Sequence, residues 1–132
     1  MTIHRYGHIA MMAIALVAVS WTVYAHGDWK APSKAAGRKN PVVRDEASIG
    51  RGKEFCRIHC AECHGDTGRG DGPRASRTWP KPRDLVQMAG HHPEGDVAWK
   101  IETGRGDMPG FKKKLKPNEI WDLVNFIQSL KP

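Results

Sequence analysis

Apart from one short apolar run near its start, the sequence lacks long apolar runs, a closed set of cysteines and any strand-like alternation. Its mean hydropathy is −0.56, which excludes a polytopic membrane protein. Three cysteines always leave one without a partner, so a small scaffold held together by disulfides is excluded. No segment alternates apolar and polar residues over the length of a strand, so a sheet is not expected. At 132 residues, the chain is also too short for two domains of which one has its own cofactor fold.

Acidic residues are missing from the first 25 positions, where Arg5 is the only Lys or Arg. An apolar stretch follows at 9–19, and Val23-Tyr24-Ala25 resembles a cleavage site after small residues. This order predicts a signal peptide over residues 1–25 and a periplasmic protein. The alternative is an uncleaved anchor, because residues 9–25 reach the lower limit of about 17 residues for a membrane span. Only in that case do we expect contact with the membrane.

Residues 26–47 have two prolines, two glycines, five basic side chains and no helical apolar stripe. This composition predicts a flexible basic N-terminal tail, either a solvated spacer or a strap that lies over the domain. Trp29 and Val42-Val43 are its only sizeable apolar side chains and could hold it to the surface. The remaining residues, 48–132, are expected to form one domain.

Helical signals dominate that domain. Ser48 can cap a first helix, in which Gly52 allows another helix to approach closely. A second helix is expected at 96–103, closed by Gly104, and a third begins at Pro117 with a broad apolar stripe. Residues 65–84 hold four glycines and three prolines, which indicates a loop region. The expected fold is therefore all-α, with short helices and long loops.

The clearest chemical signal is Cys60-Ala61-Glu62-Cys63-His64. Two thiols three residues apart, followed at once by an imidazole, form the attachment pattern for c-type haem. Each thiol can form a thioether with one vinyl group of the porphyrin, and the adjacent His64 can then ligate the iron. The motif predicts one covalently attached haem c with its iron.

Two other uses of these residues remain open. Cys56, Cys60 and Cys63 with His59 or His64 could bind zinc, although no distant second pair of ligands closes such a site. Cys60 and Cys63 could also form a redox dithiol, but no strand is expected before the motif.

Several segments together resemble a class I c-type cytochrome. They are residues 52–65 around the haem motif, Gly68-Arg69-Gly70-Asp71-Gly72-Pro73, Trp79-Pro80-Lys81-Pro82-Arg83-Asp84-Leu85, Gly104-Arg105-Gly106-Asp107-Met108-Pro109-Gly110-Phe111 and the C-terminal helix. The resemblance implies a small cytochrome c fold over 48–132, packed around one haem. It also implies that His64 is the proximal ligand of the iron and Met108 the distal ligand.

A physical argument points to the same methionine. A thioether is a soft, neutral ligand that stabilises ferrous iron. Met108 lies between Gly106 and Pro109, where the chain can approach a planar group, whereas the alternative Met88 has no such flanks.

The resemblance assigns further roles. Pro73 matches the residue whose carbonyl receives the Nδ1–H of the proximal histidine, and Trp79 and Arg83 match the region near the haem propionates. Packing of Trp79 and solvation of Arg83 are the plainer alternatives. Gly52 and Trp121 resemble the crossing point of the terminal helices, with the indole ring over the glycine.

The other cysteine and histidines have simpler interpretations. Cys56 falls on the helix face expected to be buried, so an inert packing role is favoured over a reactive or dimer-forming thiol. His59, His91 and His92 could compete as ligands, but solvated histidine is the default for all three.

Function follows from the expected ligation. With both axial positions filled by the protein, we expect a one-electron carrier without substrate chemistry. The alternative is a haem enzyme or ligand sensor, peroxidase-like, from whose iron Met108 can be displaced. Arg105 and the lysines after the ligand loop suggest redox partners with acidic docking surfaces. Nucleic acid would also suit a pI near 9.6, but export argues against it.

Overall fold

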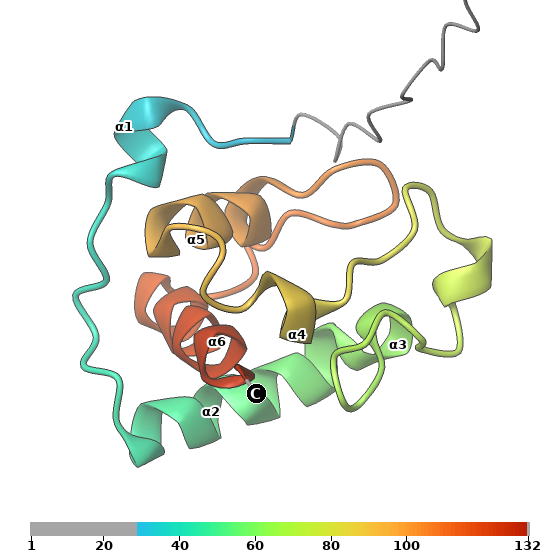
Figure 1. Cartoon of the computed structure of the whole chain (residues 1–132), viewed down its shortest axis with the longest axis horizontal. Coiled ribbons are helices and arrows are strands. Elements are labelled where there is room, and N and C mark those ends of the chain that lie inside the picture. The colour runs from blue at the N-terminus through green and yellow to red at the C-terminus, as the bar shows by residue number, and fades with distance from the viewer. Residues whose placement is uncertain (1–28, 132) are drawn as a thin grey trace, which may run out of the picture.

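The computed structural model describes residues 29–131, and all regular elements within that range are helical (Figure 1). They are α1 (Ser33–Ala36), α2 (Glu46–His59), α3 (Ala61–His64), the 3₁₀ turn η1 (Ala75–Arg77), α4 (Leu85–Met88), α5 (Glu94–Thr103) and α6 (Pro117–Ser129). The all-α prediction is confirmed. The predicted signal peptide lies outside the described residues. Within residues 29–131, no helix has the length and apolarity that a membrane span requires.

Helix α2 begins two residues before the predicted Ser48. The carboxylate of Asp45 accepts the backbone N–H of Ser48 at 2.8 Å, so Asp45 is the N-cap. Ser48 itself is fully buried, and its hydroxyl donates to the carboxylate of Asp122 at 2.6 Å. The Ser48 hydroxyl therefore joins α2 to α6 and does not cap the helix.

The other two long helices agree closely with the sequence. Helix α5 ends at Thr103, where Gly104 takes a φ of +66°, as its place after the helix predicts. Pro117 opens α6, and the carboxylate of Glu119 accepts the backbone N–H of Lys116 at 2.7 Å. This bond satisfies a donor at the helix start, where the backbone has no intrahelical partner.

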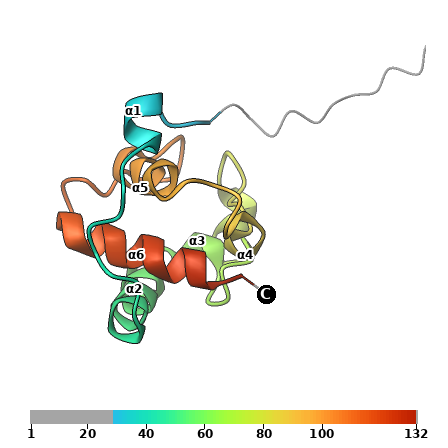
Figure 2. The same cartoon turned by 60° about the vertical axis from the view of Figure 1, so that its left-hand side comes forward.

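Helices α2 and α6 cross at Gly52, and Figure 2 shows α6 lying across α2. A Cβ on Gly52 would meet the carbonyl of Asp122 and come within 2.8 Å of the Cβ of Phe126. The close approach at Gly52 was predicted, but Trp121 was the wrong partner. Its indole ring instead faces Arg38, whose guanidinium lies 5.4 Å from the ring centroid.

The core lies between α2, α5, α6 and the segments that join them. Its buried apolar residues include Cys56, Leu85, Val97, Ala98, Ile101, Phe111, Leu115, Ile120, Leu123, Val124, Phe126 and Ile127. Most of them belong to α5 and α6, because these helices have the most apolar faces. The haem motif, in contrast, lies at the C-terminal end of α2.

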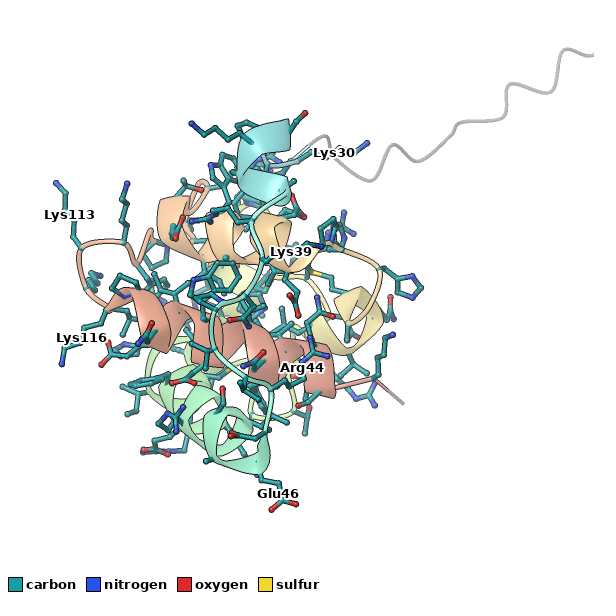
Figure 3. All side chains as sticks on the ribbon, turned by 90° about the vertical axis from the view of Figure 1, so that its left-hand side faces the viewer. Lys30, Lys39, Arg44, Glu46, Lys113 and Lys116 are labelled. Carbon is teal, nitrogen blue, oxygen red and sulfur yellow. The ribbon has the colours of Figure 1, made fainter. Side chains whose placement is uncertain are left out.

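Residues 29–45 are not a free tail but a strap that crosses α5 and α6 (Figures 1 and 3). The rings of Trp29 and Trp99 lie 6.3 Å apart, and Arg38 forms two hydrogen bonds with the carboxylate of Glu102, each 2.9 Å long. These bonds join the segment to α5, so of the two alternatives left open by its composition the structure shows the strap for residues 29–45 and not a flexible spacer.

Asn125 of α6 holds the second half of the strap. Its side chain is 1% exposed and accepts from the amide of Asn40 at 2.7 Å. Its own amide donates to the backbone carbonyls of Val42 and Val43 and to the hydroxyl of Ser48. One buried amide thus links the strap to α2 and α6.

A buried charge cluster anchors the start of the strap. The carboxylate of Asp96 lies 2.7 Å from Nζ of Lys100 and 2.9 Å from Nδ1 of His92. It also accepts the backbone N–H of Ala31 at 2.7 Å. Burial alone would raise the pKa of Asp96, but the hydrogen bonds and the nearby positive charges outweigh it and hold the pKa below its usual value.

Candidate functional site

The end of α2 and the short α3 present both motif thiols and the imidazole on adjoining turns. Cys60 interrupts the helix with φ −120°, and its carbonyl accepts the backbone N–H of His64 at 2.8 Å. Both Cys60 and Cys63 are free and half-buried. The local backbone therefore places two thiols and one imidazole within five residues of chain.

Nδ1 of His64 lies 3.0 Å from the carbonyl oxygen of Arg83. A carbonyl can only accept, so Nδ1 carries the proton and Nε2 keeps its lone pair. Burial lowers the pKa of His64, and the bond to Arg83 offsets part of this shift. The imidazole is therefore neutral at neutral pH, as a ligand to a metal must be.

Arg83 is not the partner that the sequence suggested for this histidine. The expected acceptor was the carbonyl of Pro73, which lies on an exposed part of the loop. In the structure the acceptor is instead the carbonyl of Arg83, because the loop folds back after Gly68. The backbone N–H of Leu85 donates to the carbonyl of Gly68 at 2.6 Å and brings the following segment against the motif.

Gly70 also controls where the Arg83 carbonyl lies. Its φ is +78°, and a Cβ there would come within 2.6 Å of the carbonyl oxygen of Pro82 and 3.3 Å of that of Arg83. Its backbone N–H donates to the carbonyl of His64 at 2.7 Å. Gly70 therefore lies against both His64 and Arg83, the two residues that the hydrogen bond at Nδ1 joins.

Met108 closes a tight turn after α5. Arg105 and Met108 exchange two backbone hydrogen bonds, of 2.9 and 3.0 Å. The Met108 residue is half-buried, and the guanidinium of Arg105 lies 5.9 Å from the ring centroid of Trp29 in the strap. The proposed ligand thus belongs to a turn that is defined by its own backbone.

Trp79 is joined to this turn through its backbone rather than its ring. Its N–H donates to the carboxylate of Asp107 at 2.7 Å, and its carbonyl accepts the N–H of Asp107 at 3.0 Å. The Trp79 residue is 71% exposed, and Arg83 is exposed as well. Sequence reasoning missed the Asp107 contact, and its only signal was the position of Asp107 directly before the candidate methionine.

Cys56 is 5% exposed and belongs to the core, in keeping with the favoured packing role. Its thiol is a neighbour of that of Cys60. The interaction with the Cys56 thiol, together with burial, raises the pKa of Cys60.

The competing ligands are otherwise engaged or exposed. The ring of His59 packs 5.8 Å from that of Phe111, His92 pairs with Asp96, and His91 is exposed. Among the described residues, no group of three or more His, Cys, Asp or Glu side chains could hold a metal ion. The zinc alternative therefore has no structural support in this part of the chain.

Comparison with known proteins defines the class. The family model described as "Cytochrome C oxidase, cbb3-type, subunit III" matches residues 47–127. The chain therefore belongs to this family of c-type cytochromes, which confirms the resemblance drawn from the sequence. Haem c with its iron, attached covalently, is the cofactor that this membership implies, so the predicted cofactor is confirmed.

Individual relatives are larger proteins. The chain is 31% identical over 88 residues to a cytochrome bc1 complex cytochrome c subunit of Corynebacterium diphtheriae; the match covers 66% of the chain but only 29% of that relative. Among solved structures, a reducing HAO-like protein complex of Kuenenia stuttgartiensis contains a chain that is 33% identical to this one, with a TM-score of 0.63. The match covers 76% of this chain and 50% of that chain. Cytochrome cL of Methylophaga aminisulfidivorans is 20% identical with a TM-score of 0.52, over 66% of this chain and 55% of that one, and shows the shared fold.

The side chains of the motif fit this cofactor. Cys60 and Cys63 are free thiols, and His64 is a neutral imidazole with its Nε2 lone pair available. Haem c requires these three groups at the spacing of the C-x-x-C-H motif.

Proposed function

We propose that this protein is an exported one-electron carrier whose iron is ligated by His64 and Met108. The hydrogen bond from Nδ1 of His64 to the carbonyl of Arg83, beside two free thiols, is the observation that supports it most directly. Such a bond fixes the orientation of a ligating ring and raises its basicity. Haem c, when bound, supplies an iron that cycles between its ferric and ferrous states.

Each residue then has a defined task. Cys60 and Cys63 provide the two thioether links, and His64 offers Nε2 to the iron. Met108 offers its sulfur from the turn at 105–108, which its two backbone hydrogen bonds support. The guanidinium of Arg83 is exposed and can bind a haem propionate through charge-assisted hydrogen bonds.

Pro73 and Trp79 have smaller parts in this proposal. Pro73 ends the loop after the motif, and its carbonyl is not the acceptor for His64 in this structure. The exposed ring of Trp79 is free to cover the edge of the haem near the propionates. Both residues remain predictions from the family resemblance.

A carrier is favoured over a haem enzyme or ligand sensor because both axial positions would be filled. A sensor or peroxidase-like enzyme needs the methionine to leave the iron, whereas the turn that carries Met108 is tied to the Trp79 backbone. One relative belongs to a bc1 complex and another to an HAO-like complex. These assemblies support redox proteins as partners.

The partners are expected to be acidic. Lys112, Lys113 and Lys114 directly follow the methionine loop, are exposed, and form no salt bridge with a described carboxylate. Lys116 is exposed as well, and Figure 3 shows Lys113 and Lys116 projecting from the same side of the molecule. We define these four residues as the lysine patch. They would steer an acidic partner toward the haem edge.

Location in the periplasm rests on residues 1–25. Their apolar segment and the small residues that follow favour cleavage, after which the domain would be released. If the segment is retained, the carrier would be tethered to the membrane.

Two measurements test the proposal. A pyridine haemochrome spectrum of the exported protein should show covalent haem c, and Cys60→Ala with Cys63→Ala should abolish it. The ferric protein should also show the weak far-red band that the resemblance implies for methionine-sulfur ligation. Without that band, and with rapid binding of carbon monoxide to the reduced protein, the sensor or enzyme would be the correct function.

A further inference from the structure

The Asp107 carboxylate joins the methionine turn to the segment that precedes α4. Its Oδ2 atom accepts the N–H of Trp79 at 2.7 Å, a short distance for a bond between a carboxylate and a backbone amide. The backbone N–H of Asp107 returns a bond of 3.0 Å to the carbonyl of Trp79. Two residues 28 positions apart are therefore held by a reciprocal pair of bonds.

The same segment reaches the histidine at its other end. Trp79 contacts the methionine turn, while four residues later the carbonyl of Arg83 accepts from His64. A Cβ on Gly106 would meet the carbonyl of Trp79 and lie 2.8 Å from Cδ of Pro80, so the turn is packed directly on this segment. Residues 79–83 thus contact the structures that carry both proposed ligands.

Among these contacts, only one is made by a side chain of the methionine turn. Arg105 and Met108 shape the turn through their own backbone, but that bonding does not fix where the turn lies in the fold. Three groups of the turn reach atoms outside it: the Asp107 carboxylate and the Asp107 N–H, which both bond the Trp79 backbone, and the Arg105 guanidinium beside the Trp29 ring. The carboxylate makes the shorter of the two hydrogen bonds. It is also exposed, so no core packing depends on it.

We propose that Asp107 is a positioning residue for Met108, which it holds at the haem by tying the turn at 105–108 to the backbone of Trp79. This inference rests on the proposed ligation of the iron by Met108. It adds that the Asp107 carboxylate, directly before Met108, slows detachment of the methionine from the iron. The bond resists detachment only while Oδ2 accepts from Trp79.

The test compares Asp107→Ala with Asp107→Asn in the mature haem protein. Both variants lose the same charge, but Asn keeps an oxygen that can accept the Trp79 N–H. A bond to a charged group is roughly twice as strong as a neutral one. We therefore expect the rate of carbon monoxide binding to the reduced protein to rise about tenfold in Asp107→Ala and about threefold in Asp107→Asn.

The far-red band of the ferric protein provides a second measurement. It should weaken in Asp107→Ala and be largely retained in Asp107→Asn, and a urea titration of both variants separates this effect from a general loss of folding stability. Equal rates and equal bands in the wild type and both variants would overturn the inference while leaving Met108 as the ligand. A wild type that lacks the band would instead overturn the proposed ligation, and the inference with it. If Asp107→Ala does not accumulate as a haem protein, Asp107→Asn alone provides the test. A rate of carbon monoxide binding equal to that of the wild type would then overturn the inference.

Discussion

The carbonyl oxygen of Arg83 accepts a hydrogen bond from Nδ1 of His64, at 3.0 Å and across 19 residues of chain. This bond selects the tautomer in which Nε2 is free. It also makes the backbone after Pro82 part of the candidate site, through the carbonyl of Arg83. The electronic character of the imidazole therefore depends on how the loop before α4 is packed.

Replacing Gly70 should disturb that bond. In Gly70→Ala, the new Cβ would have to occupy a φ of +78° and lie within 2.6 Å of the Pro82 carbonyl. We expect a loss of about 2 kcal/mol in unfolding free energy. The reduction potential should rise, because a less basic imidazole stabilises ferric iron less well. Denaturant titration and redox titration measure the two effects. An unchanged potential would show that Gly70 does not hold the Arg83 carbonyl in place.

The crossing of α2 and α6 predicts opposite results for two glycines on one helix. Gly52→Ala would place a Cβ against the Asp122 carbonyl, which is backbone and cannot move cheaply, so we expect a loss of about 3 kcal/mol. Gly50→Ala has no atom within 4 Å of its Cβ and should stabilise the protein by about 0.5 to 1 kcal/mol. Urea unfolding of the two variants would show this difference. Similar losses for both would argue against a close helix contact at Gly52.

Asp96 should make stability depend on pH. Its pKa is lowered in the folded protein, so its contribution is present above the ordinary carboxyl pKa and is lost as the pH falls through the folded value. At pH 7, Asp96→Asn should cost about 3 kcal/mol, because Lys100 is 7% exposed and would be left without its partner. The difference from the wild type should shrink below about pH 4.

Glu94→Gln is the control for this experiment. Glu94 pairs with Arg44 at a partly exposed site, where a salt bridge contributes less than about 1 kcal/mol. Its loss should therefore be small. If Asp96→Asn were no more damaging than Glu94→Gln, the charge cluster would not anchor the strap.

The lysine patch should govern the ionic-strength dependence of electron transfer. With an acidic redox protein, the association rate should fall as salt is added, and replacing Lys112, Lys113 and Lys114 by Gln should lower the low-salt rate about tenfold. Stopped-flow mixing measures this rate. Replacing Lys30, Lys34 and Lys39 by Gln removes the same charge from the strap, which faces another way in Figure 3, and should have little effect. Equal effects of the two triple variants would mean that only net charge matters.

Local signals in the sequence predicted much of the helical structure. The Gly after Thr103, the Pro at the start of α6 and the apolar stripe of α6 act within one or two turns of chain, so the ends of α5 and α6 were nearly correct. The start of α2 was predicted at Ser48 because serine is a common N-cap. Asp45 took that role, since Ser48 is buried against Asp122.

The sequence by itself determined the class of protein and its cofactor, because the two thiols and the imidazole of residues 60–64 are neighbours along the chain and their spacing alone carries the chemistry. Only the tertiary structure decided which carbonyl His64 bonds, which residues meet Gly52, and that the basic segment at 29–45 lies on α5 and α6. Each of these contacts joins residues far apart in the chain. Such contacts depend on how loops close and helices pack, and no local pattern of residue types encodes them.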